Sequence, residues 1–129
     1  MNYYFNNTLN NISFDDAKEK VIEELKKEGF GVLSQINIKT TLKNKLDVDF
    51  RPYVILGACN PPLAYKTLQA EAKIGLMLPC NVIVEENENG TIEVSAVNPV
   101  ASMIAVKNDN LADIASEVEQ ILKKVIENL

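Results

Sequence analysis

The side chains best suited to chemistry occur in two short motifs that contain both cysteines of the chain. The first motif is Cys59-Asn60-Pro61, which ends the apolar run 53–58, and the second is Pro79-Cys80-Asn81, which ends the run 74–78. Each run has the composition of a buried strand, so we predict a Cys-Asn pair at the end of each of two strands. A thiol can act as a nucleophile, a redox group or a soft-metal ligand, and an asparagine offers both a donor and an acceptor. If the two strands are neighbours, both pairs line one pocket.

Cys59 is predicted to lie at the beginning of a helix. Pro61-Pro62 fits a first helical turn, where proline sacrifices no intrahelical donor. The helix dipole and free amides at that position favour a thiolate and lower a thiol pKa. From the residues alone, four interpretations remain open: a redox thiol pair, half of a soft-metal site, a ligand pocket lined by amides, or two small buried hydrophobic side chains. The 21-residue separation of Cys59 and Cys80 matches no metal-binding or Cys-x-x-Cys spacing.

The residue types that are missing exclude a long list of chemistries. The sequence contains no histidine, which removes Ser-His-Asp and Cys-His nucleophile pairs, histidine ligation of zinc or haem, and the usual proton shuttle near neutral pH. Arg51 is the only arginine, so any bidentate clamp on a phosphate would depend on it. No glycine-rich phosphate loop and no calcium loop is present, so the cofactor stays unknown and no residues are assigned to a metal site.

Composition predicts a single soluble domain over residues 1–129. The chain is 47% hydrophobic and 24% charged, which suffices for an ordinary core. Its net charge of −5 and interleaved lysines and glutamates argue against a nucleic-acid partner, which needs a basic stripe. No segment approaches the ~18 apolar residues of a membrane span. We therefore expect a cytoplasmic protein with no membrane partner and reduced thiols.

The first half of the chain is predicted to begin strand, helix, strand, short helix. The strands are expected at 3–8 and 30–38, with Val32, Ser34 and Ile36 on one side of the second. A helix beginning at 14 has Ser13 as its N-cap and ends before Gly29. A short helix over 40–46, capped by Lys39-Thr40, precedes the strand at 53–58.

The second half is predicted to add a helix, a hairpin and a final helix. The helix beginning at Pro61 is expected to end at Ile74-Gly75, and a strand over 76–86 pairs with 91–97 through the Asn89-Gly90 turn. A connector over 99–106 leads to an amphipathic helix over 111–128, capped by Asp109 or Asn110. The predicted fold class is α+β, with an antiparallel sheet of about five strands, two long helices and one or two shorter ones.

These motifs resemble an uncharacterised family called domain of unknown function three-hundred-two. The resemblance depends on 41–46, Tyr53 to Pro61 and Ile74 to Val82, and it extends over roughly 14–106. It implies a fold similar to that of the TATA-binding protein and members that often form dimers, but no established activity. The family motif falls on the following candidate residues: Cys59, Asn60, Pro61, Pro79, Cys80 and Asn81. Lys43, on the short helix, is a further candidate to face an anionic ligand near Asn60.

Three hypotheses for function follow, in order of preference. The first is a homodimeric module that binds a small molecule or a partner through a pocket near the two Cys-Asn motifs. The second is a thiol-dependent redox enzyme or sensor, with Cys59 as the nucleophile and Cys80 as the resolving partner. The third is soft-metal binding by these two cysteines, completed by a partner chain.

Overall fold

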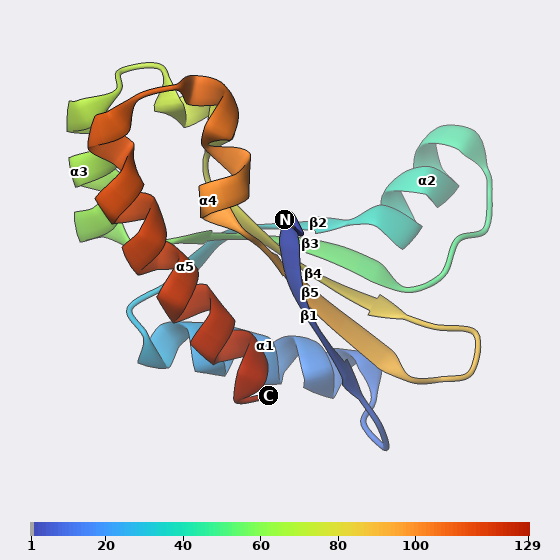
Figure 1. Ribbon diagram of the computed structural model, residues 1–129. Coiled ribbons are helices and arrows are strands. Elements are labelled where there is room, and N and C mark those ends of the chain that lie inside the picture. The colour runs from blue at the N-terminus through green and yellow to red at the C-terminus, as the bar shows by residue number, and fades with distance from the viewer. Residues whose placement is uncertain (1) are drawn as a thin grey trace.

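The computed structural model describes residues 2–129, which form a five-stranded sheet with helices packed on one face and at both ends (Figure 1). The strands run in the order β1-β5-β4-β3-β2, and every neighbouring pair is antiparallel. Their bounds are β1 Tyr4–Leu9, β2 Gly31–Asn37, β3 Tyr53–Cys59, β4 Cys80–Glu86 and β5 Ile92–Val97. The predicted α+β class with a five-stranded antiparallel sheet is confirmed, and the further likeness to the TATA-binding protein stays a prediction.

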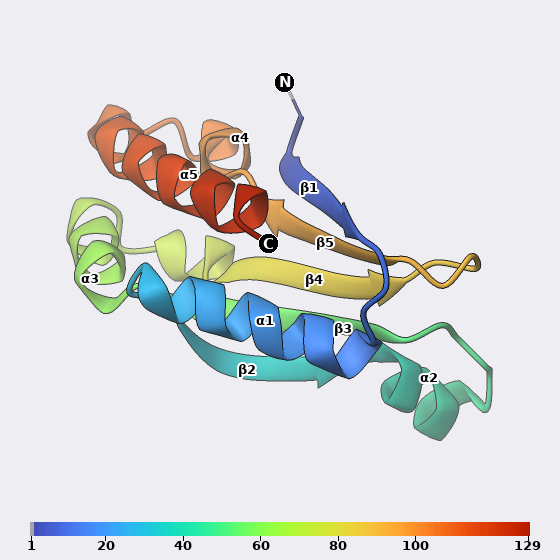
Figure 2. The ribbon, with the colours of Figure 1, turned by 90° about the horizontal axis from the view of Figure 1, so that it is seen from below.

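Two long helices cover one face of the sheet. They are α1 (Phe14–Lys27) and α5 (Ala112–Glu127), which lie side by side across the strands (Figure 2). Ser13 caps α1 by accepting a hydrogen bond from the Asp16 amide, as the sequence predicted. Among the described residues, no helix combines the length and the apolar character that crossing a bilayer requires.

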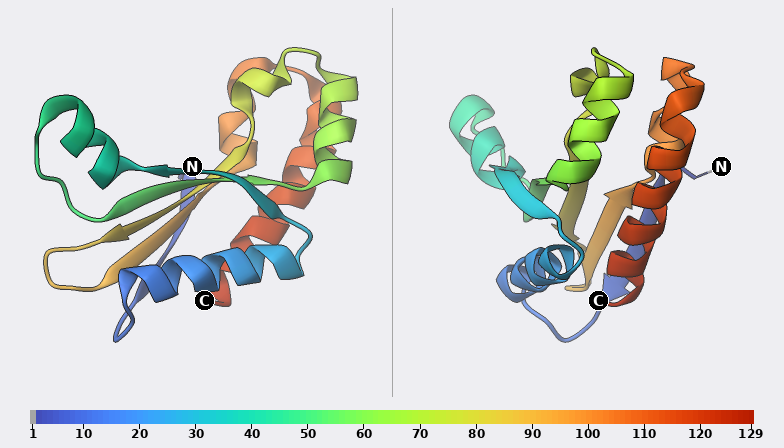
Figure 3. Two further views of the ribbon diagram at one scale, coloured as in Figure 1. Left: turned by 180° about the vertical axis from the view of Figure 1, so that it is seen from behind. Right: turned by 90° about the vertical axis from the view of Figure 1, so that its left-hand side faces the viewer.

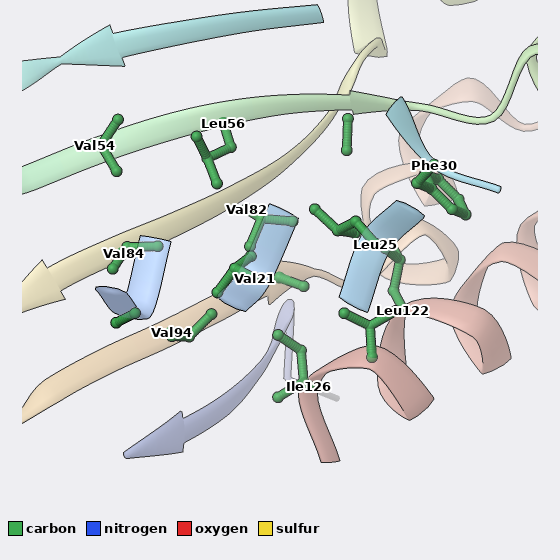
Figure 4. Close-up of a cluster of buried hydrophobic side chains, with 14 of the residues drawn as sticks. Val21, Leu25, Phe30, Val54, Leu56, Val82, Val84, Val94, Leu122 and Ile126 are labelled. Atoms are coloured by element: carbon green, nitrogen blue, oxygen red, sulfur yellow. The ribbon is translucent and has the colours of Figure 1, made fainter. Parts of the chain in front are cut away.

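The hydrophobic core lies between this face of the sheet and the two helices (Figure 4). Alternate residues of the central strands point into it, which places Leu56, Val82 and Val94 opposite α1 and α5. The periodic apolar positions Leu25 and Leu122 complete it from the helices. The pattern confirms that β3 is an interior strand, because its inward side chains are almost fully buried.

The remaining helices gather at the two ends of the sheet. At one end, α3 (Pro61–Ala70), α4 (Pro99–Ser102) and the first half of α5 extend past the strands, while α2 (Ile38–Leu46) lies at the opposite end (Figures 1 and 3). Three short 3₁₀ helices complete the set: η1 (Ile74–Met77), η2 (Ile104–Val106) and η3 (Asp109–Leu111). The connector 99–106 thus contains the helical turn that the sequence allowed.

The largest error of the sequence prediction concerns the run 74–79. It was assigned to a helix end and a buried strand, but Ile74–Met77 is a 3₁₀ helix and β4 begins only at Cys80. Leu76 is 85% exposed, although its apolar neighbours resemble a strand. The Leu78-Pro79 peptide bond is cis. Proline also has no N–H to donate to a neighbouring strand, so Pro79 does not extend β4. Cys80-Asn81 therefore begins a strand instead of ending one.

Smaller errors concern a register shift and two helix caps. A bulge between Val32 and Ser34 moves Ile36 to the face away from α1, so the predicted one-sided alternation in β2 is wrong. The short helix begins at Ile38 and is capped by Asn37, whose side chain accepts from the Thr40 amide. At α5 the predicted cap residues do not cap the helix, because η3 precedes it and has Asn108 as its own cap.

Candidate functional site

The two Cys-Asn motifs converge at one end of the sheet. In the antiparallel pairing of β3 with β4, Ala58 lies opposite Cys80, so the end of β3 meets the beginning of β4. The predicted convergence therefore occurs, although through the beginning of the second strand. Had Cys80 ended an antiparallel strand, as predicted, it would lie at the far end of the sheet.

A cavity of about 440 Å³ opens beside these strand ends. It lies between α3 on one side and α4 and the first half of α5 on the other, with the 75–79 segment and the ends of β2, β3 and β4 completing its wall. Figure 3 shows α3 and α5 standing side by side beyond the sheet. We call this space the α3–α5 cavity. Four of the seven predicted site residues line it: Cys59, Asn60, Pro79 and Cys80.

The α3–α5 cavity is lined almost entirely by apolar side chains. Helix α5 contributes Ile114, Ala115 and Val118, and α3 contributes Leu63 and Leu68. Among the described residues that line it, none is an aspartate, glutamate, lysine or arginine. Its polar side chains are Ser34, Cys59, Asn60, Thr67 and Cys80.

The other three predicted site residues do not line this cavity. Pro61 begins α3 but is not part of the wall, and Asn81 instead lines a second hollow on the opposite face, together with Tyr53 and Arg51. Lys43 lies on α2 at the far end of the sheet, where its Nζ is 2.9 Å from Asp47 Oδ1. The expectation that Lys43 faces a ligand near Asn60 is wrong, because β2 and β3 place α2 and Asn60 at opposite ends.

The two cysteines do not form a thiol pair. Both are free, and alternation along β3 points Cys59 away from the face shared by Ala58 and Cys80. Burial raises the pKa of the Cys80 thiol to about 11, and the electrostatic effect of Cys59 adds a smaller contribution. The proposed exchange between Cys59 and a resolving Cys80 is therefore unsupported.

Asn60 determines how α3 begins. Its side-chain Oδ1 accepts the Leu63 N–H at 3.3 Å, which makes it the N-cap. Pro61 and Pro62 have no N–H, and the Ala64 amide donates to the Asn60 carbonyl at 2.9 Å. The free amides that the sequence analysis expected beside Cys59 are thus missing: the first turn has none left to stabilise a thiolate.

The sequence analysis missed most residues of the cavity wall. Ser34 lines the cavity next to the bulge in β2, and no pattern in the sequence indicated this bulge. The apolar stripe of α5 was interpreted as core or as a dimer face, whereas Ile114, Ala115 and Val118 in its first half also line the cavity. Leu78 was also missed because it was placed in a strand, and Gly75 because it was placed at a helix end.

No metal centre is indicated in the described part of the chain. Within residues 2–129, no group of three or more histidine, cysteine, aspartate or glutamate side chains is gathered as metal ligands would be. The separated orientations of Cys59 and Cys80 remove the two-thiolate half-site on which the soft-metal hypothesis depended.

Comparison with known proteins identifies related sequences and structures. The family model described as "Domain of unknown function DUF302" matches residues 5–129. The crystal structure of the uncharacterized conserved protein DUF302 from Bacillus stearothermophilus superposes with a TM-score of 0.90 at 30% identity, and the match covers 98% of each chain. No curated protein matches the chain.

Proposed function

Because the chain belongs to the DUF302 family of domains of unknown function, we propose its function from the geometry of the α3–α5 cavity: a single-domain module that binds a small molecule. The observation that supports this proposal is the cavity itself, with about 440 Å³ between two helices and the ends of three strands. Ligand sites are typically concave, largely apolar spaces of ~300–1,000 Å³ with a few polar groups. The α3–α5 cavity has this size and this composition.

Binding is favoured over thiol chemistry by the state of the two cysteines. A catalytic thiol reacts as its thiolate, which low pKa values and helix amides promote. Burial raises the pKa of Cys80 to about 11, and the first turn of α3 has no free amide to offer Cys59. The sequence contains no histidine to act as a base for either thiol.

The proposal is tested by titrating the protein with Nile red, an uncharged dye that fluoresces in apolar surroundings. We expect saturable binding to the wild type. Ala115 lines the cavity and is 7% exposed, so Ala115→Phe should fill the space and abolish the signal. Ala112→Phe, on the exposed side of the same helix, is the matched control and should bind normally. Ala64→Phe fills the cavity from α3 and replaces the first variant if that variant does not fold.

We also propose that two copies associate through the sheet face opposite α1 and α5. In the described residues no helix crosses the middle of this face (Figures 1 and 3). Its apolar side chains include Ile55, Ile83 and Ile36, of which Ile36 is 48% exposed. Apolar side chains that meet their own copies suit a two-fold interface, although this face also carries Arg51 and Glu85.

Sedimentation equilibrium tests the association. Ile36→Glu should convert a dimer to a monomer, because a charge would be buried at the interface. Leu46→Glu, on α2, is the control, since Leu46 is also exposed, at 66%, but belongs to a helix and not to a strand of this face. A wild type that sediments as a monomer at every concentration overturns this part of the proposal.

We place the module in the cytoplasm and assign it no nucleic-acid partner. The two free thiols are typical of a reducing compartment. The net charge of −5 disfavours contact with a polyphosphate backbone.

A further inference from the structure

The wall of the α3–α5 cavity contains no group that could neutralise a charged ligand. None of the described lining residues is acidic or basic. A charge transferred from water into such a space without a partner is strongly disfavoured, and the group loses its charge instead. The wall therefore disfavours carboxylates, phosphates and amines alike.

The beginning of α3 would normally compensate for the missing cations, but here it does not. Helix N-termini bind anions through the unpaired N–H groups of the first turn. Pro61 and Pro62 contribute no N–H, and the Leu63 N–H is taken by Asn60 Oδ1. The next amide, that of Ala64, is taken by the Asn60 carbonyl. An anion placed against residues 61–64 would therefore find no free backbone donor.

The polar side chains that remain available can all act as donors. Asn60 uses its Oδ1 for the cap, and its Nδ2, which lies beside Gly29, makes no hydrogen bond within residues 2–129. The Thr67 hydroxyl is already used, because it donates to the Leu63 carbonyl at 2.7 Å. Ser34 Oγ makes no side-chain hydrogen bond with any of the described residues. The donors lie at the strand ends, whereas α5 lines the far side with aliphatic groups.

We propose that the α3–α5 cavity selects an uncharged ligand with a hydrocarbon body and one hydrogen-bond acceptor, such as an ester or ketone carbonyl, directed at Asn60. This inference rests on the proposed binding function and names the chemical class of its ligand. The hydrocarbon body packs between α3 and α5. The carbonyl oxygen accepts from Asn60 Nδ2, with Ser34 as a further donor.

Isothermal titration with three probes of equal chain length tests the ligand class: methyl decanoate, decanoate and decylamine. The ester should bind best. The ionised acid should bind at least about a hundredfold more weakly at neutral pH, since its charge has no partner. The affinity of decanoate should rise by about tenfold for each unit by which the pH is lowered, because only the protonated acid fits. The rise should end when the pH reaches the acid's own pKa. Decylamine should bind as poorly as decanoate.

Asn60→Asp reverses the polarity of the site without removing the cap. Aspartate is as good an N-cap as asparagine, so the Leu63 N–H keeps its acceptor. The variant loses the Nδ2 donor and gains a negative charge in the wall. It should bind the ester about tenfold more weakly and should bind decylamine better than the wild type does. Asn37→Asp is the matched control, because Asn37 caps α2 in the same way at the other end of the sheet.

The outcomes separate this inference from the function on which it rests. If Nile red and the ester both fail to bind, the binding function itself is wrong. If decanoate binds as tightly as the ester at neutral pH, the cavity does bind ligands but the uncharged class is wrong. If Asn60→Asp leaves the order of the three probes unchanged, Asn60 does not direct the acceptor.

Discussion

Pro79 packs directly against Gly57, on the strand that ends at Cys59. A Cβ atom added to Gly57 would lie 2.8 Å from Pro79 Cγ and would also overlap Ser34 Oγ. Real Cβ atoms essentially never approach another atom so closely, and the proline ring has little freedom to move away. The missing side chain of Gly57 therefore lets the segment before β4 close over β3, which shapes one wall of the α3–α5 cavity.

The close contact predicts that Gly57→Ala destabilises the protein by roughly 1–3 kcal/mol, the usual cost of overpacking. Urea denaturation measures the change. Gly31→Ala is the control, because nothing lies within 4 Å of the added Cβ. It should change stability by no more than about 0.5 kcal/mol. Equal effects of the two substitutions would show that Pro79 can move away from the added Cβ without a loss of stability.

The capping bond of Asn60 predicts a second effect on stability. Asn60→Ala removes the acceptor of the Leu63 N–H and should lower the free energy of unfolding by about 1 kcal/mol. Asn60→Asp retains an acceptor, so it should lose less stability than Asn60→Ala in urea denaturation. A loss of the same size in both variants would mean that the amide group matters for a reason other than the cap.

The buried thiol of Cys80 should be unreactive near neutral pH. Its pKa is raised from 9.0 to about 11, so its thiolate fraction is roughly a hundredfold lower than that of an ordinary thiol. In a Cys59→Ala variant, alkylation by iodoacetamide should be slow and should accelerate as the pH rises toward 11. Unfolding in urea should restore ordinary reactivity. An equal rate in the folded and unfolded protein would contradict the burial of Cys80.

The same shift gives Cys80 a defined contribution to the pH dependence of stability. Because the pKa of the folded state is the higher one, the unfolded chain releases this proton first as the pH rises. The contribution of Cys80 to the free energy of unfolding is complete below pH 9.0 and is lost between pH 9.0 and about 11. Urea midpoints of wild type and Cys80→Ala should therefore converge over this range. A constant difference between the two proteins would contradict the linkage.

Two residues of the misassigned run 74–79 should differ in how much their substitution lowers the stability of the protein. Ile74 is 1% exposed, so Ile74→Ala should cost about 2–4 kcal/mol in thermal or urea unfolding. Leu76 is 85% exposed, so Leu76→Ser should change stability by less than about 0.5 kcal/mol. A buried strand would make both substitutions costly, and that result would favour the sequence prediction over the structure.

The parts of the fold that the sequence predicted well are those where composition, period and caps agree. α1 has Ser13, an apolar stripe and Gly29, and the sheet has the Asn89-Gly90 turn. The run 74–79 was misassigned because its apolar composition is the same whether a side chain is buried or, like Leu76, exposed. Gly75 and Pro79 were the local signals against a strand.

The candidate site was predicted in part because chain order indicates which strands are neighbours. Cys59, Asn60, Pro79 and Cys80 line one cavity because β3 and β4 are adjacent and antiparallel. Lys43 was misplaced although the chain order argues against it: α2 precedes β3 and Asn60 follows β3, so this strand separates them. Ser34 depended on a bulge, and Ala115 on the extension of α5 past the sheet, and neither feature has a periodic signature.

A crystal structure of the wild-type protein grown with methyl decanoate tests the central claim most directly. The account predicts a bound molecule between α3 and α5, with its chain against Ala115 and its carbonyl oxygen within hydrogen-bond distance of Asn60 Nδ2. An unoccupied or closed cavity at saturating ester, or a molecule bound elsewhere on the protein, would contradict it.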